Sequence, residues 1–89
     1  MIGPGATPAA AAADCNTWVS NSAPYTGYAK CTGMTVLDRF RVKVICIDSR
    51  GTKTTMFGPM KKNAQTSSKK CSDNPNVGVY QVGSEVWRI

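Results

Sequence analysis

Arg-Phe-Arg-Val-Lys-Val-Ile-Cys-Ile-Asp, at residues 39–48, predicts a β-strand with one buried face, because apolar and charged side chains alternate along it. The apolar side is made of Phe40, Val42, Val44 and Cys46. The opposite side starts with Arg39, Arg41 and Lys43 and becomes apolar at Ile45 and Ile47. We interpret this stretch as the central strand of a sheet, with Cys46 on its buried face as one end of a covalent link to another part of the chain.

The segments on either side of this strand are short and are separated by residues typical of turns. Asp-Ser-Arg-Gly at 48–51 predicts a hairpin turn that leads into a strand at 52–57. Further strands are expected at 16–20, 25–31, 65–71, 77–82 and 85–89, with 65–71 at a sheet edge and Gly83-Ser84 interrupting the last two. No stretch has a helical period. The predicted fold class is all-β, a small antiparallel β-sandwich of about six to seven strands.

The cysteines predict two disulfides, because Cys15, Cys31, Cys46 and Cys71 occur in a chain of 89 residues that has no histidine. Their spacing lacks the Cys-x-x-Cys pairs of structural zinc sites. Three pairings are open. We expect the sequential one, Cys15 with Cys31 and Cys46 with Cys71, because it closes two short loops. Each bridge should add about 3 kcal/mol to the free energy of unfolding. Disulfides persist in oxidising compartments, so the cysteines indicate an extracellular protein.

Residues 1–13 differ in composition from the rest of the chain, since they consist mainly of alanine, proline and glycine. They lack the charged start and long apolar core of an intact signal peptide, but Ala11 and Ala13 match the small-residue pattern before a cleavage site. Two interpretations stay open, a trimmed secretion signal or a flexible arm, and the disulfide-linked domain is assigned to 14–89. No later segment approaches the ~18 apolar residues of a membrane span, so we expect a soluble, secreted protein without a transmembrane segment.

Catalytic chemistry is poorly represented in this composition. The absence of histidine excludes a Ser-His-Asp or Cys-His arrangement. The five acidic residues stand mostly at predicted turns or strand ends, and they are Asp14, Asp38, Asp48, Asp73 and Glu85. There is no glycine-rich phosphate loop and no EF-hand pattern. We therefore expect a protein that is not an enzyme and has neither a cofactor nor a metal site.

A net charge of +6 suggests a basic binding surface. The candidate basic patch consists of Arg39, Arg41, Lys43, Lys61, Lys62, Lys69 and Lys70. If the lysine-rich segment at 60–70 folds beside the basic side of the central strand, one face would attract an anionic cell-surface polymer or an acidic protein. Export disfavours nucleic acid as the partner. The alternative interpretation is a solvated face that keeps the protein soluble.

The aromatic residues are candidate anchors for a protein partner, because interfaces use tryptophan and tyrosine for this purpose. Trp18, Tyr25 and Tyr28 lie within the loop that a Cys15–Cys31 disulfide would close. Trp87 and Arg88 form a second candidate cluster near the end of the chain. The alternative is that some of these rings belong to the core.

Two sequential disulfides in an all-β chain of this size resemble the tendamistat family of actinobacterial α-amylase inhibitors, and that resemblance implies a six-stranded sandwich. The family inhibits through a Trp-Arg-Tyr turn in its first disulfide loop. This chain has Trp18-Val19-Ser20 there, so the inhibitory motif is not carried over.

Residues 39–86 are similar to small secreted actinobacterial proteins, through Arg-Val-Lys-Val-Ile-Cys-Ile-Asp, Met-Phe-Gly-Pro and Cys-Ser-Asp-Asn-Pro-Asn-Val-Gly-Val. Some such proteins are adaptors in extracellular toxin particles and hold a partner with an extended N-terminal arm, a role that residues 1–13 would suit.

Two classes of function follow from these observations. The first is a secreted, non-enzymatic module that binds an extracellular protein, either as an adaptor through the arm or a strand edge, or as an inhibitor through the first disulfide loop. An inhibitor of an α-amylase-type enzyme is a narrower version of it. The second is a cationic antimicrobial or cell-surface-binding protein, whose binding should weaken steeply with salt.

Overall fold

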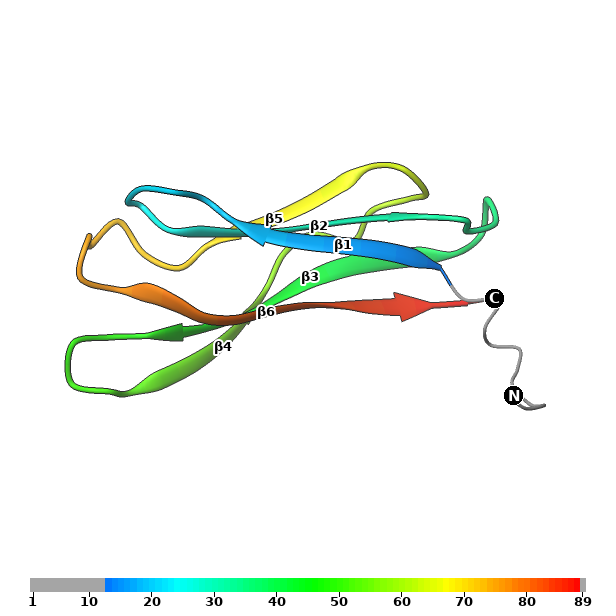
Figure 1. The fold of residues 1–89 in the computed structure, drawn as a ribbon. Helices are drawn as coiled ribbons and strands as arrows, with labels where there is room; N and C mark the ends of the chain where they lie inside the picture. Colours follow the sequence, from blue (N-terminus) through cyan, green and yellow to red (C-terminus); the bar gives the residue numbers. More distant parts are fainter. Residues whose placement is uncertain (1–12, 89) are drawn as a thin grey trace, which may run out of the picture.

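The computed structural model describes residues 13–88 and contains two antiparallel sheets of three strands (Figure 1). The strands are β1 (Asp14–Val19), β2 (Thr26–Thr32), β3 (Arg39–Ile47), β4 (Lys53–Phe57), β5 (Thr66–Lys70) and β6 (Gly78–Trp87). One sheet has the order β1-β2-β5 and the other has the order β4-β3-β6. The predicted all-β sandwich is confirmed, with six strands in the described residues.

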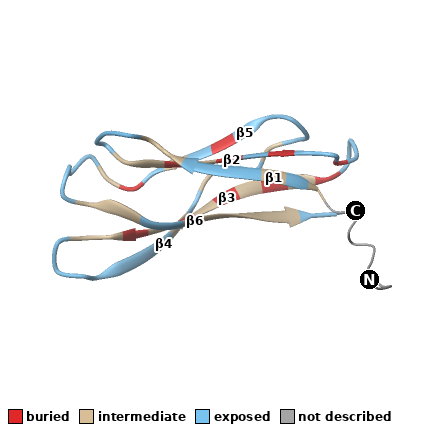
Figure 2. Cartoon of the chain, in the orientation of Figure 1, coloured by how far each residue is buried: buried red, intermediate tan, exposed pale blue. Residues whose placement is uncertain are grey.

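β3 is the central strand of its sheet, between β4 and β6, as the alternation at 39–48 predicts. Its buried side chains alternate strictly with half-buried ones. Phe40, Val42 and Val44 have no solvent exposure, and Cys46 is 4 % exposed. These residues belong to the core cluster, and the buried parts of the chain in Figure 2 lie on β2, β3 and β5 and on the segments next to these strands.

Two hairpins follow from local sequence. β1 and β2 are joined by the polar segment at 20–25, and Cys15 lies directly opposite Cys31 in their ladder. β3 and β4 are joined by the predicted turn, in which the Asp48 side chain accepts hydrogen bonds from the N–H groups of Arg50 and Thr52. An aspartate at the first turn position stabilises a turn in this way. β5 is an edge strand, also as predicted.

The prediction of two separate C-terminal strands is wrong, because β6 runs without interruption from Gly78 to Trp87. Gly83 pairs with Lys43 and Ser84 with Val42, so the long central strand supplies a partner at both positions. Glycine and serine weaken a strand locally, but a ladder along nine residues of β3 outweighs that preference. The irregularity in this pair lies between Ile45 and Cys46, where the register shifts.

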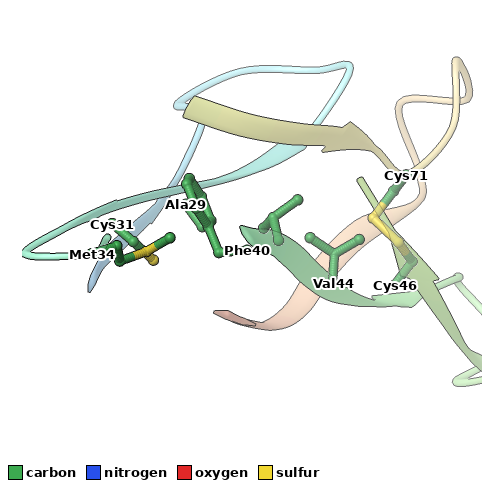
Figure 3. Packing of buried hydrophobic residues seen from close by; sticks show 8 residues of the cluster. Ala29, Cys31, Met34, Phe40, Val44, Cys46 and Cys71 are labelled. Atoms are coloured by element: carbon green, nitrogen blue, oxygen red, sulfur yellow. A yellow bond between two sulfur atoms is a disulfide. The ribbon is translucent and has the colours of Figure 1, made fainter. Parts of the chain in front are cut away.

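Both disulfides have the expected sequential pairing. Cys15–Cys31 joins neighbouring strands of one sheet. Cys46–Cys71 joins β3 to the residue after β5 and so links the two sheets, as the yellow bond in Figure 3 shows. The buried cluster around these bridges consists of Ala29, Cys31, Met34, Phe40, Val42, Val44, Cys46 and Cys71. A small core of this kind gains much from covalent links, because it buries limited apolar surface.

The predicted arm or signal remnant at 1–13 lies almost wholly outside the described residues, which begin at Ala13. Ala13 is partly buried and packs against the core. Nothing in the range 13–88 is a helix with the length and apolar character needed to cross a membrane.

Candidate functional site

The fold brings some of the candidate binding residues close together, and most of these lie on the solvent-facing side of the β4-β3-β6 sheet. Since alternate residues of β3 point into the core, the intervening ones and their cross-strand partners form the opposite face. We call this surface the outer β3 face, and it comprises Arg39, Arg41, Lys43, Ile45 and Ile47 of β3, Lys53, Thr55 and Phe57 of β4, and Tyr80, Gln81, Gly83, Glu85 and Trp87 of β6.

Arg41 is held between two aromatic rings at one end of this face. Its guanidinium carbon lies 3.8 Å from the centroid of the Phe57 ring and 5.1 Å from that of Trp87. Phe57 comes from β4 and Trp87 from β6, and both are diagonal neighbours of Arg41 in the register. Diagonal pairs in a sheet lie within reach of long and aromatic side chains, so the pairing of three strands builds this cluster.

Glu85 completes the cluster from the position directly opposite Arg41. The Arg41 Nε and Nη2 atoms each lie 3.0 Å from the Glu85 Oε1 atom. Both side chains are about one-third exposed, so water screens this pair and its contribution to stability is small. What the pair does is fix the plane of the guanidinium, because a planar fork that donates from two atoms has little freedom left.

A second cation–ring contact lies at the other end of the face. The Lys53 Nζ atom is 4.0 Å from the centroid of the Tyr80 ring. Lys53 belongs to β4 and Tyr80 to β6, so the lysine side chain reaches across β3. Tyr80 is 55 % exposed, which leaves much of its ring open to a partner.

Between the two clusters the face has a hollow of about 260 Å³. It is lined by Lys43, Ile45, Gln81, Gly83 and Ser84. Lys43 and Gly83 are direct cross-strand partners, and the glycine contributes no side chain at this position. The hollow is therefore a gap in the row of side chains on β6.

The chemistry of the outer β3 face suits recognition of another molecule. Trp87 is 42 % exposed and Phe57 38 % exposed, and such rings provide rigid apolar contact area. Arginine, tryptophan and tyrosine are the residue types that dominate binding energy at protein interfaces. The face carries four cations, Arg39, Arg41, Lys43 and Lys53, and one carboxylate, Glu85, so it favours an acidic partner.

Of the three aromatic candidates in the first disulfide loop, two lie together. The rings of Trp18 and Tyr28 are stacked, with centroids 5.3 Å apart and an angle of 9° between their planes. The two residues are opposite each other on β1 and β2, on the sheet that does not contain β3. Tyr25 lies before β2, is half-buried, and its carbonyl accepts a hydrogen bond from the Cys71 N–H.

Arg88 and Trp87 are neighbours in the sequence but contact different residues. The Arg88 Nε atom lies 3.6 Å from the Asp38 Oδ2 atom, and Asp38 is 1 % exposed. The same Asp38 oxygen accepts the Thr35 N–H. Arg88 thus contacts a buried carboxylate that orders the segment before β3, while Trp87 belongs to the Arg41 cluster.

The basic candidates fall into two groups. Arg39, Arg41 and Lys43 follow one another along the outer side of β3. The strand that carries Lys69 and Lys70 belongs to the other sheet, and neighbouring residues of a strand point to opposite faces. Lys70 pairs with Asp73. Lys61 forms an isolated bridge with Phe40 through its backbone, next to Lys62 in the β4–β5 connection.

Several residues of the outer β3 face were not among the sequence-based candidates, namely Phe57, Tyr80, Gln81, Gly83 and Glu85. Their alternation within each strand is visible in the sequence, but the register that sets β6 beside β3 joins residues about forty positions apart. No local pattern specifies such a register.

No set of three or more histidine, cysteine, aspartate or glutamate residues within 13–88 is arranged to hold a metal ion. Comparison of the chain with protein-family models, with curated proteins and with solved structures finds no significant match.

Proposed function

We propose that this protein is a secreted, non-enzymatic module that binds another extracellular protein through the outer β3 face. The observation that carries the proposal is the Arg41 side chain, held between Phe57 and Trp87 and oriented by Glu85. Secretion is supported by two disulfides, both built into the core cluster or packed against it.

The arrangement of Arg41 supports binding for an entropic reason. An immobilised side chain that is rich in rotamers costs about 0.5–1.5 kcal/mol when it becomes ordered on binding. Arg41 is already ordered by two rings and a carboxylate, so a partner would meet a guanidinium whose position is set beforehand. The exposed parts of Phe57 and Trp87 flank it and can exclude water from the contact.

Between adaptor and inhibitor, the position of these residues favours the adaptor. The outer β3 face is formed by three paired strands and not by a projecting loop, so it matches a flat surface of a partner better than an enzyme cleft. The aromatic candidate for a loop inhibitor, Trp18, lies within β1 and stacks on Tyr28. The α-amylase-type inhibitor therefore gains no support from these contacts.

The test compares Arg41→Ala and Trp87→Ala with Trp18→Ala. Trp18 and Trp87 have the same exposure, 42 %, but lie on different sheets, so Trp18→Ala is a matched control for loss of an exposed tryptophan. The wild-type chain is cross-linked to proteins in the culture medium of the producing organism, the captured protein is identified by mass spectrometry, and its purified form is titrated by calorimetry against each variant.

We expect Arg41→Ala and Trp87→Ala to weaken binding about thirtyfold, as for hot-spot residues, and Trp18→Ala to bind like the wild type. Equal binding by all three variants would show that another surface carries the function. Capture of mixed anionic polymer that washes off with salt, with no defined protein retained, would favour a cationic cell-surface-binding protein instead.

A further inference from the structure

We infer that the hollow over Gly83 is a socket for a single glutamate side chain from an acidic protein partner. The inference deepens the proposed function and rests on it, since it assumes that the outer β3 face is the binding surface. The group that would enter the hollow of about 260 Å³ is a carboxylate on a short apolar stem.

The first observation is that neither backbone geometry nor packing requires a glycine at position 83. The glycines with positive φ in the described chain are Gly33 and Gly51, so Gly83 has a conformation open to any residue. A Cβ atom added to Gly83 would meet nothing within 4 Å, whereas one added to Gly27 would lie 2.2 Å from the Val44 Cγ1 atom. A glycine within a strand weakens it, because glycine loses more backbone entropy than other residues and has no side chain to pack. Because Gly83 has no side chain, it leaves open space on the outer β3 face.

The second observation is the size of that space. Pockets for small molecules usually have volumes of about 300–1,000 Å³ and enclose most of the ligand. The hollow has about 260 Å³ and is open to solvent along the sheet surface, on which Tyr80 and Trp87 stand exposed. These dimensions suit one side chain that projects from a larger partner, rather than a free metabolite.

The third observation is the charge of the residues that line the hollow. Three of the four cations on the outer β3 face already have partners: Arg41 has Glu85 and two rings, Lys53 has the Tyr80 ring, and Arg39 donates to the carbonyls of Val36 and Asp38. Lys43 forms no ion pair with any residue between 13 and 88. The cation that lines the hollow is thus available to a carboxylate from outside.

These features together select glutamate. Its methylene groups can pack against the apolar Ile45 side of the hollow while its carboxylate pairs with the Lys43 ammonium, and Gln81 lines the same space with an amide that can donate to the second oxygen. A lysine or arginine would be repelled by Lys43. An anionic polysaccharide would need a row of available cations, and this face has one at the hollow, which favours a protein as the source of the carboxylate.

The experiment is an NMR titration of ¹⁵N-labelled protein with the capped peptide Gly-Ala-Glu-Ala-Gly, its counterpart Gly-Ala-Gln-Ala-Gly, and polygalacturonate. The test variant is Gly83→Val, which fills the hollow, and the control is Gly78→Val. Gly78 lies in the same strand, and a Cβ atom there also meets nothing within 4 Å. Both variants should keep the wild-type melting temperature or exceed it, because valine favours strands.

We expect the glutamate peptide to shift the amide signals of Lys43, Ile45, Gln81 and Ser84 in the wild type and in Gly78→Val. In Gly83→Val the apparent affinity should fall about tenfold or more, and the glutamine peptide should bind equally weakly to the wild type. Equal effects of the two peptides, equal binding by Gly83→Val, or no shifts at these residues would overturn the inference. So would tighter binding of polygalacturonate at the same residues, which would assign the hollow to a polysaccharide.

The inference and the proposed function can fail separately. If a captured protein partner depends on Arg41 and Trp87 but binds Gly83→Val normally, the face is the interface and the socket is wrong. If that partner is indifferent to Arg41→Ala and Trp87→Ala, the proposed function itself fails.

Discussion

The Ser67 hydroxyl accepts a hydrogen bond from the Val42 N–H at 3.0 Å, and so joins β5 of one sheet to β3 of the other. The same hydroxyl donates to the Pro59 carbonyl at 2.7 Å. β4 ends at Phe57, opposite Lys43, so Val42 lies beyond the last residue that β4 pairs. Ser67 is fully buried, and its hydroxyl is the acceptor for the Val42 N–H in place of a carbonyl from a longer β4 strand.

Replacing this hydroxyl should destabilise the fold. Ser67→Ala leaves the Val42 N–H and the Pro59 carbonyl without this buried partner, so the free energy of unfolding should fall by about 1–3 kcal/mol. Guanidinium chloride titration followed by tryptophan fluorescence measures the change. Ser68→Ala is the control, because Ser68 is exposed and its substitution should change stability by less than about 0.5 kcal/mol. Equal effects of the two substitutions would contradict the role of the buried hydroxyl.

Gly27 of β2 lies so close to Val44 of β3 that the space between the sheets has no room for a side chain at position 27. A Cβ atom on Gly27 would lie 2.2 Å from the Val44 Cγ1 atom and 3.2 Å from the Val82 Cγ2 atom, so Gly27→Ala should lower the free energy of unfolding by about 1–3 kcal/mol. Adding Val44→Ala should recover part of the loss from Gly27→Ala, since it removes the clashing methyl groups. A double-mutant cycle by chemical denaturation measures the coupling, and strictly additive effects would show that the two sites do not interact.

The disulfide between the sheets should contribute strongly to stability. Cys46–Cys71 spans 25 residues and is the covalent link between β3 and the end of β5, so replacing both cysteines with alanine should cost about 3 kcal/mol. The matched variant lacks Cys15–Cys31, which spans 16 residues and joins neighbouring strands that remain hydrogen-bonded. We expect the inter-sheet variant to have the lower melting temperature by calorimetry. If the variant without Cys15–Cys31 had the lower melting temperature, the stability of the fold would depend more on the first hairpin than on the covalent link between the sheets.

The turn at Asp48 makes stability depend on acidity. The Thr52 N–H and then the Arg50 N–H and guanidinium hold the pKa of Asp48 below its ordinary value of 3.8, because they favour the ionised carboxylate. When the pKa of a carboxyl is lower in the folded state than in the unfolded state, its ionised form stabilises the fold at every pH above the unfolded-state pKa. This stabilisation is lost as the pH falls through the folded-state pKa. The melting temperature should therefore fall below about pH 4.

Asp48→Asn tests this dependence, because asparagine keeps an acceptor oxygen at the turn but has no charge to lose. We expect the variant to be less stable than the wild type at pH 7, with a smaller fall in melting temperature on acidification. If the melting temperatures of the two proteins fall by the same amount on acidification, another carboxylate causes the acid sensitivity.

Much of the fold can be predicted from local sequence, because strand alternation and turn chemistry act over a few residues. The period of two at 39–48 identifies β3 and its buried side chains, and Asp48 with Gly51 identifies the following hairpin. The number of cysteines and the absence of histidine indicate the two disulfides. The edge position of β5 follows from its lysines.

The candidate site is a different case, because pairing between distant strands creates it. The sequence places Trp87 beside Arg88, but the register of β6 on β3 places its ring over Arg41, and Arg88 contacts Asp38 instead. Gly83 has the local character of a strand interruption, and only its ladder partner Lys43 makes it an open position within a continuous strand. Alternation within one strand determines which residues share a face, but which strands lie side by side, and in what register, is decided when the sheets pack together and bury that face.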